Sequence, residues 1–458
     1  MGAAESYRAV PYEGGVYPQT HPDVLATVST LVGLRPAHPA RCRVLELGCA
    51  DGANLVGMAA YLPDCEFVGL DAAENHIVAG EALRRAAGLD NVRLLVGDIA
   101  SPPPLGTFDY IVAHGIYSWI PAEIRRAMLG LCRDHLAPHG VAYISYNTLP
   151  GWHQALPIRD LMRYHTRNIT DPAEVVAQGR AIVDFAAEAS GKLLHTSSSA
   201  YLATLADDYV FHDLLEEVNE PVFLHDFIAQ AEAGGLQYIG DAELSRSLDL
   251  NFPEPTRAVL HQLSSDPVVI EQYMDFLTNR TLRRTLLCRA DTPLRRELDV
   301  SVLQGMQVAL PLTEVKELVD GTAYRRPGNP EDMVIATEPW QRDLLERLRK
   351  RWPAALPIRG MAPEAVELLL ACALRGFADL RTWSAPVVRQ PSAQPAVVPL
   401  VRAQAQAGQP LTSALLQGVH VSAAADRALI ATLDGSVSPP PGHEAALDRL
   451  GRLGLLVG

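Results

Sequence analysis

The sequence of 458 residues contains no apolar run as long as the roughly 20 residues that a membrane-spanning helix needs. The longest uncharged apolar stretch lies within 365–374, which is too short to cross a bilayer. The N-terminus, MGAAESYRAV, has no basic segment followed by an apolar one, so it does not resemble a secretory signal peptide. We therefore expect a cytoplasmic protein without a membrane partner.

The sequence is also poor in positive charge. It has 39 Lys and Arg against 53 Asp and Glu, and its formal net charge is -14. Nucleic-acid binding needs clustered basic residues, whereas here they are scattered, apart from 342–351, where acids are interspersed. This composition argues against a nucleic-acid partner and is compatible with a basic protein, a basic peptide or a cationic amine.

Cysteine is scarce, and its spacing excludes the common metal and redox motifs. No C-x-x-C pair is present, and no histidine pair has zinc-finger spacing. The six cysteines, most of them in apolar contexts, are Cys42, Cys49, Cys65, Cys132, Cys288 and Cys372. We expect buried, reduced thiols and no metal site.

Apolar strands alternate with helices between residues 43 and 146. The expected strands are 43–48, 66–71, 92–98, 108–115 and 140–147, and the expected helices are 52–61, 73–87 and 121–135. Near-continuous apolar strands joined by helices predict an α/β fold with a doubly wound parallel sheet, covered on both faces. Short strands at 236–239 and 285–288 are expected to complete this sheet. The helices between would then be an insertion that caps the site, or alternatively a separate domain from about residue 151.

The pattern changes beyond residue 290. Short strands are expected within 306–312 and 332–339, followed by a helix at 340–351, an irregular stretch rich in Pro, Ala and Gln, and two amphipathic helices. This C-terminal α+β region resembles winged helices, but it lacks a basic recognition face, which favours protein contacts. The expected divisions are 1–35 (an N-terminal arm over the site), 36–290 (the main domain, with a helical insertion at about 154–205), 291–383 (a strand–helix domain), 384–410 (a linker) and 411–458 (a helical module).

The turn after the first strand reads E-L-G-C-A-D-G, residues 46–52. Gly48 and Gly52 would let a ligand approach the backbone at a helix N-terminus, although small residues there can also simply pack a helix on a strand. The turn lacks the G-x-G-x-x-G pattern that holds a pyrophosphate, and Glu46 suits a cation better than a phosphate. S-adenosylmethionine has no phosphate and carries an ammonium and a sulfonium. The turn therefore predicts a cradle for this cofactor, where the methyl group of Ala50 is tolerated.

Acidic residues also end the next two strands. Asp71 can accept hydrogen bonds from both hydroxyls of a ribose. Asp98 can accept one from the exocyclic amine of adenine, with Ile99 against the ring. Because the carboxyl ends of parallel strands share one edge of the sheet, these acids are expected beside the Glu46 turn.

These motifs together resemble those of class I methyltransferases over residues 44–146. Four longer phrases, YPQTHPDVLAT, AHGIYSWIP, SYNTLPGWH and FHDLLEEVNEPVFLHDF, resemble bacterial methyltransferases with a methyltransferase regulatory domain. That family includes protein-lysine methyltransferases that act on rickettsial outer-membrane proteins. The resemblance implies a Rossmann-like fold, S-adenosylmethionine as cofactor with S-adenosylhomocysteine as product, and a regulatory segment at about 206–290. It implies the cofactor more firmly than the acceptor.

The loops after the fourth and fifth strands and the N-terminal arm complete the expected site. His114 is either a general base or a hydrogen-bonded residue that shapes the cofactor pocket, and Asn147 either orients the nucleophile or bonds its own backbone. Tyr117 and Trp119 could wall a pocket for an alkylamine, although Trp119 could equally be ordinary packing. The expected catalytic residues are His114, Tyr117 and Asn147. The expected acceptor-binding residues are Tyr117, Trp119, Tyr146 and Trp152. The expected cofactor-binding residues are Glu46, Gly48, Cys49, Ala50, Gly52, Asp71, Ala72, Asp98, Ile99, His114, Gly115, Tyr17 and Gln19.

Methyl transfer is an in-line displacement at a sulfonium methyl, so the enzyme mainly positions a nucleophile and excludes water. We expect N-methylation of an amine, a lysine side chain or a peptide amine, on a protein or peptide. The alternatives are a small-molecule O- or N-methyltransferase, a cofactor-binding regulator without catalysis and, least favoured, a dehydrogenase. The C-terminal region could grip the substrate, regulate, or form a homodimer.

Overall fold

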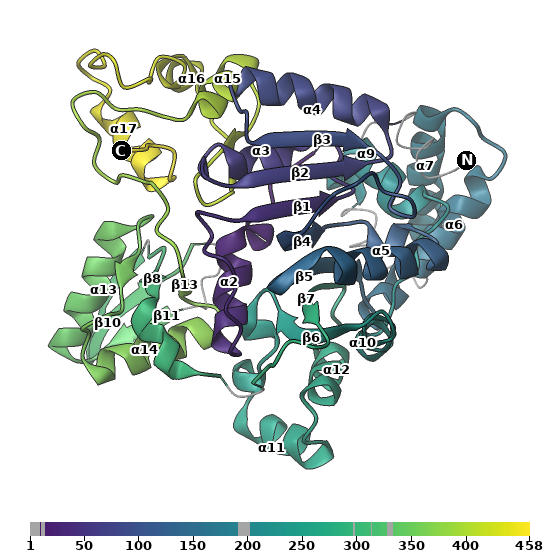
Figure 1. Cartoon of the computed structure of the whole chain (residues 1–458), viewed down its shortest axis with the longest axis horizontal. Coiled ribbons are helices and arrows are strands. Elements are labelled where there is room, and N and C mark those ends of the chain that lie inside the picture. Colours follow the sequence, from purple (N-terminus) through teal and green to yellow (C-terminus); the bar gives the residue numbers. More distant parts are fainter. Residues whose placement is uncertain (1–9, 11–13, 191–201, 296–297, 313, 328–332) are drawn as a thin grey trace.

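A seven-stranded sheet forms the centre of the computed structural model, which describes all residues except 1–9, 11–13, 191–201, 296–297, 313 and 328–332 (Figure 1). The strand order is β3-β2-β1-β4-β5-β7-β6, in which the first five strands are parallel and β7 is antiparallel to both of its neighbours. The strands are β1 Arg43–Leu47, β2 Glu66–Asp71, β3 Val92–Val96, β4 Phe108–Ala113, β5 Leu136–Asn147, β6 Leu236–Asp241 and β7 Leu282–Arg289. The predicted doubly wound α/β fold is confirmed, and so are the two late strands.

Helices cover both faces of this sheet, because successive strand residues point to opposite sides. On β1, Val44 belongs to one hydrophobic core, whereas Leu45 and Leu47 belong to the other. The helices α2 Pro22–Leu31, α3 Ala53–Ala59 and α4 Glu74–Ala86 supply the first face, and α5 Ala122–His135 and α10 Leu224–Ala233 supply the second.

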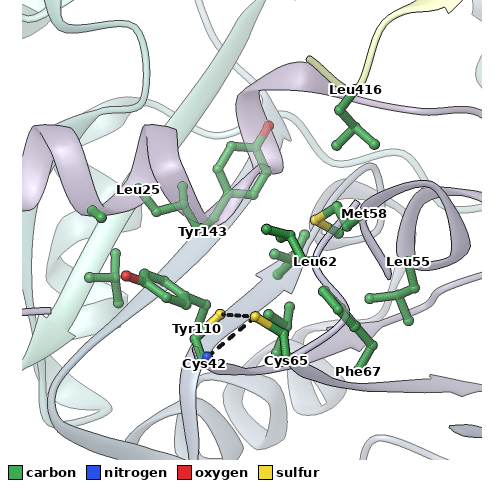
Figure 2. Packing of buried hydrophobic residues seen from close by; sticks show 14 of the residues in the cluster. Leu25, Cys42, Leu55, Met58, Leu62, Cys65, Phe67, Tyr110, Tyr143 and Leu416 are labelled. Carbon is green, nitrogen blue, oxygen red and sulfur yellow. Dashed lines mark hydrogen bonds between the residues drawn. The ribbon is translucent and has the colours of Figure 1, made fainter. Parts of the chain in front are cut away.

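Figure 2 shows part of the first core, where Leu25 of α2 and Met58 of α3 pack near Phe67 and Tyr110. The thiols of Cys42 and Cys65 lie in the same core, with their sulfur atoms 3.6 Å apart. All six cysteines are buried, as expected, and each is a free thiol in this structure.

Helices fill the connections between the last strands of the sheet. The segment from β5 to β6 contains α6 Leu156–Thr166, α7 Pro172–Ser190, α9 Asp207–Tyr209 and a π-helix, η4 Val210–Leu215. Buried residues such as Met162, Val183 and Val210 give it a small core of its own. Part of the expected insertion, 191–201, lies outside the described residues. Between β6 and β7, α11 Glu254–Leu263 and α12 Pro267–Thr278 form a helical pair.

The described part of residues 307–381 contains two three-stranded sheets and two α-helices. One sheet has the order β12-β8-β13 and the other β11-β10-β9. Their strands are β8 Gln307–Ala309, β9 Glu314–Leu318, β10 Gly321–Arg325, β11 Met333–Ala336, β12 Leu356–Pro357 and β13 Asp379–Arg381, and the helices are α13 Pro339–Arg351 and α14 Pro363–Leu374. The expected strands near 306–312 and 332–339 and the helix at 340–351 are confirmed.

The expectation that 384–410 is irregular throughout is wrong. It contains α15 Pro399–Ala407, whose residues Leu400, Val401 and Ala405 are buried. Proline stands in the first turn, where it is compatible with a helix, and Gly408 ends the helix with a φ of 76°. The helix shares a core with the expected C-terminal helices, α16 Ala424–Ile430 and α17 Glu444–Arg452, and with the hairpin β14 Leu411–Thr412 and β15 Gly418–Val419.

No helix in the described part of the chain has both the length and the apolar character of a bilayer span.

A buried ionic network anchors α12 to the sheet. Arg283 of β7 is fully buried and pairs with Asp275 at 2.8 Å and with Glu271 at 2.7 Å, both on α12. The hydroxyl of Tyr238 on β6 donates to the same Glu271 carboxylate at 2.8 Å. Three elements therefore depend on one guanidinium group.

We expect Arg283→Met to lower the free energy of unfolding by about 3–5 kcal/mol, because the buried Glu271 would lose its ion pair and keep the Tyr238 hydroxyl, and the buried Asp275 would keep Arg280 in place of two arginines. Urea denaturation followed by circular dichroism measures the change. The control is Arg347→Met on α13, whose side chain is 59% exposed and which should change stability by less than about 0.5 kcal/mol. Equal effects of the two substitutions would contradict the structural role of the network.

Candidate functional site

The turn between β1 and α3 has the unusual backbone that its small residues suggest. Gly48 has a φ of 64°, and a Cβ at this position would lie 2.5 Å from Cγ2 of Ile116. Ala50 also lies in the left-handed region, with a φ of 47°, which costs a non-glycine residue about 1–2 kcal/mol. Its N–H donates to Oδ2 of Asp71 at 2.9 Å. The acid at the end of β2 therefore holds the turn in place.

Glu46, at the end of β1, is a buried carboxyl group with an incomplete set of partners. It is 4% exposed, and its Oε1 accepts a hydrogen bond from Nδ2 of Asn54 at 2.9 Å. Its Oε2 is buried and accepts no hydrogen bond from the described residues. Burial, together with the nearby Asp51 and Asp71, raises the pKa of Glu46 to about 8. Such a carboxyl group is suited to a ligand that carries a cationic hydrogen-bond donor.

The N-terminal arm lies against this turn through the same asparagine. The N–H of Tyr17 donates to Oδ1 of Asn54 at 3.0 Å, and Nδ2 of Asn54 donates to the hydroxyl of Thr20 at 3.0 Å. A Cβ at Gly14 would overlap the carboxylate of Asp51, so a larger residue there would require the Asp51 side chain to move. Asn54 is not among the residues predicted from the sequence, although a polar residue on the inner face of α3 is a visible signal.

His114, at the end of β4, lies within a network of hydroxyl groups under the arm. Its Nδ1 is 3.0 Å from the hydroxyls of both Tyr143 and Ser145, and its ring centroid is 4.0 Å from that of Tyr17. Gln19 bonds the Tyr143 hydroxyl. Burial, with a contribution from Arg284, lowers the pKa of His114 to about 3. A neutral imidazole of such low basicity favours the pocket-shaping role over general-base catalysis at neutral pH. The neighbouring Gly115 donates its N–H to Ser145 at 2.8 Å.

Asn147, at the end of β5, joins the β4 loop to a later segment. Its N–H donates to the hydroxyl of Ser118 at 2.9 Å, and its Nδ2 donates to Oδ1 of Asn219 at 3.2 Å. It therefore does not bond its own turn, which was the alternative considered from the sequence. The indole rings of Trp119 and Trp152 meet edge to face nearby, with centroids 6.4 Å apart.

The structure corrects three expected placements. Tyr117 and Tyr146 are almost completely buried against Phe227 of α10, so they lie in the core and do not line an acceptor pocket. Their hydroxyls are also occupied, by Gln230 and Thr285 respectively. The thiol of Cys49 points into the other core, against Gly69, so this residue can offer a ligand only its backbone. Tyr146 faces α10 because strand residues alternate between the two faces of the sheet.

The other expected cofactor residues lie along the same edge of the sheet. Asp98 is exposed, and one of its oxygens accepts the N–H of Ala100 at 2.8 Å, which leaves lone pairs for a ligand. Ile99 is half-buried and Ala72 is exposed, and Gly52, with a φ of 69°, precedes α3. No cluster of three His, Cys, Asp or Glu side chains in the described part of the chain could hold a metal ion.

Comparison with known proteins gives two family matches and close relatives. A model described as a methyltransferase domain matches residues 45–142, and one described as a predicted methyltransferase regulatory domain matches 206–289. The uncharacterized protein RP789 of Rickettsia prowazekii is 34% identical over 377 residues, which covers 78% of this chain and 68% of that protein. The uncharacterized protein RP028 of the same organism is 33% identical over 238 residues, 50% of this chain and 94% of that protein.

The fold also matches a solved structure, that of PKMT2 from Rickettsia typhi in complex with AdoHcy. The TM-score is 0.85 at 23% sequence identity, and the match covers 98% of this chain and 100% of the other.

The buried state of Glu46 predicts how stability depends on pH. Its pKa in the folded chain lies above the ordinary value of 4.5, so its contribution is complete below about pH 4.5 and is lost as the pH rises through 8. We expect Glu46→Gln to unfold less readily than the native protein at pH 8–9, by roughly 2–5 kcal/mol, with the difference vanishing near pH 5. Denaturant titrations at each pH, without ligand, measure this difference.

Glu66→Gln is the control, since Glu66 begins β2 at the opposite edge of the sheet and its pKa is lowered by the hydrogen bond from Arg43. This substitution should have the opposite sign at neutral pH, and its effect should be small because the pair is solvent-exposed. A pH-independent difference between Glu46→Gln and the native protein would show that Glu46 is already ionised in the folded state.

Proposed function

This chain belongs to the bacterial family of methyltransferases that carry a methyltransferase regulatory domain, and on that premise we propose that it N-methylates a lysine side chain or peptide amine on a protein or peptide. The observation that carries the proposal is the buried Glu46 carboxyl group with an unpartnered oxygen, next to a turn that holds no pyrophosphate pattern. S-adenosylmethionine is the methyl donor of this enzyme class, and S-adenosylhomocysteine is the product.

The residues at the edge of the sheet fit this cofactor. The free oxygen of Glu46 can accept a hydrogen bond from the ammonium group, and the absence of a side chain at Gly48 lets the ligand approach the backbone. Asp71 uses one lone pair of each oxygen on the N–H groups of Ala50 and Ala73, so each oxygen keeps one for a ribose hydroxyl. Asp98 is exposed at the end of β3, where an adenine amine would lie.

The groups near Asn147 support an amine acceptor. The half-buried Trp152, which packs edge to face on the buried Trp119, offers aromatic surface to an alkylamine. The carboxamides of Asn147 and Asn219 offer oxygens to its N–H groups. The amine attacks as the neutral base: its lone pair forms the new N–C bond while the C–S bond of the sulfonium breaks, and a proton leaves the nitrogen. His114 is too weakly basic to hold that proton at neutral pH. Its hydroxyl network instead keeps the arm and the β4 loop in position.

Transfer of a labelled methyl group from S-adenosylmethionine to a cell lysate, resolved by size, tests the acceptor class. Label in polypeptides supports the proposal. Label confined to small molecules would contradict it and favour a small-molecule O- or N-methyltransferase, and a lack of transfer despite cofactor binding would favour a non-catalytic regulator.

We expect Asp71→Ala to weaken the binding of S-adenosylhomocysteine at least about tenfold, because the ribose acceptor and the anchor of the Ala50 turn are both lost. Isothermal titration calorimetry measures the affinity, and circular dichroism checks the fold. Asp90→Ala is the control, since this fully exposed acid lies in the α4–β3 loop, and it should bind as the native protein does. Undiminished affinity of Asp71→Ala, or comparable binding of NAD by the native protein, would contradict the assignment.

A further inference from the structure

A second concave site lies beside the methyl-transfer edge and is not part of the cofactor cradle. This cavity of about 690 Å³ is bounded by α2, by the turn η5 Leu244–Arg246 after β6, and by the segments around Arg375, Arg381 and Gln417. In Figure 1, α2 lies between the central sheet and the region of β8 and β13.

The cavity and the proposed catalytic edge share structural elements. Gln19 lines the cavity and bonds the hydroxyl of Tyr143, which in turn contacts His114. On the other wall, Glu243 accepts a hydrogen bond from Arg284 at 2.6 Å, and Arg284 is the charge that acts on His114. A molecule in the cavity would therefore lie next to the groups that position the β4 loop.

Two buried polar groups of the cavity wall offer hydrogen bonds that the described residues do not use. The hydroxyl of Thr27 is buried and has no partner there. His21 accepts the N–H of Asp23 at its Nδ1, at 3.1 Å, which leaves the proton on Nε2 as a donor. The imidazole is 6% exposed and stacks on Trp383, so it is held rigidly.

The carboxylates of the cavity, in contrast, are already paired. Asp23 accepts three hydrogen bonds from Thr382 and Trp383, at 2.7–2.9 Å. Glu243 and Asp379 each face two arginines.

Four arginines and three acids line the cavity. Of these arginines, Arg375 is exposed and forms no ion pair with the described residues. Besides neutral side chains such as Ser245 and Gln417, the cavity therefore offers one positive charge without an ion pair, Arg375, in a chain whose net charge is -14. This combination selects a ligand with carboxylate groups.

We propose that this cavity binds an acidic segment of the acceptor polypeptide, in which one carboxylate meets Arg375 and a second acceptor group meets Thr27 and His21. The inference rests on the proposed function, since it assigns the cavity to the same acceptor. The cavity is larger than a single side chain needs, and Gln19 places it within reach of a chain that also enters the catalytic edge. Acidic residues near the target lysine would then determine which proteins are methylated.

The first test compares two short peptides with one lysine, which differ only in flanking Glu and Asp against Gln and Asn. We expect the acidic peptide to be methylated with a kcat/KM about tenfold higher or more. In Arg375→Glu the preference should fall to about twofold or less, with unchanged affinity for S-adenosylhomocysteine. Arg347→Glu on α13 is the matched control and should keep the preference. A preference that survives in Arg375→Glu, or is absent from the native protein, would overturn the proposal.

Thr27→Val tests the interior of the cavity. Because its hydroxyl makes no hydrogen bond to the described residues, the variant should unfold like the native protein while its KM for the acidic peptide rises severalfold. An unchanged KM would remove Thr27 from the binding site and contradict the proposed contact.

Binding of a fluorescent, lysine-free acidic peptide separates this inference from the proposed function. Anisotropy should show binding to the native protein and its loss in Arg375→Glu, whether or not methyl transfer occurs. Binding without methylation of any lysine peptide would contradict only the proposed function. Equal binding of the peptide by the native protein and by Arg375→Glu would overturn the cavity assignment. It would also be overturned if free succinate displaced the fluorescent peptide as effectively as the unlabelled peptide does, because the site would then be one for small dicarboxylates.

Discussion

The burial of one carboxyl group, Glu46, constrains the site more than any other interaction. A carboxyl group removed from water needs hydrogen-bond partners, and the described residues supply only one, from Asn54. The same Asn54 amide holds the N-terminal arm through Tyr17 and Thr20, so the arm closes over the strand end that it covers. Two further features accompany this arrangement: small residues in the turn after β1, and glycine at position 14, where the arm passes the Asp51 carboxylate. The unpartnered oxygen of Glu46 therefore depends on the positions of the turn, of Asn54 and of the N-terminal arm together.

The central sheet and the acidic edge could be predicted from the sequence because they depend on local patterns. Buried parallel strands are continuous apolar runs, and their carboxyl ends necessarily share one edge, which brings Glu46, Asp71 and Asp98 together. The late strands β6 and β7 were found in the same way, although their antiparallel pairing depends on the intervening helices. Helix α15 is not among the predicted elements, because a stretch rich in Pro, Ala and Gln favours an irregular chain, whereas Pro399 here lies in the first turn of a helix.

The predictions failed where a role depends on contacts between distant segments. Tyr117 and Tyr146 belong to loops or strand ends near the site, but α10 covers the face to which they point, and nothing near them in the sequence indicates this. Asn54 was overlooked for the converse reason, since its partners Glu46 and Tyr17 come from different elements. For His114 the sequence left two roles open, and the choice depends on its burial beside Tyr143 and Ser145, which only the assembled sheet produces.

Helix α2 connects these two halves of the chain. Its N-terminal end carries the arm over the cradle, and Asp23 in its first turn accepts three hydrogen bonds from Thr382 and Trp383, far along the sequence. Residues 17–23 therefore contribute both to the wall of the cavity and to the cover of the proposed cofactor site, so a ligand in one site lies close to the other. The net charge of the chain does not reveal this arrangement, because the same acidic chain has one edge of its sheet rich in carboxylates and a separate cavity rich in arginine. The local arrangement of charges decides which ligand each site accepts.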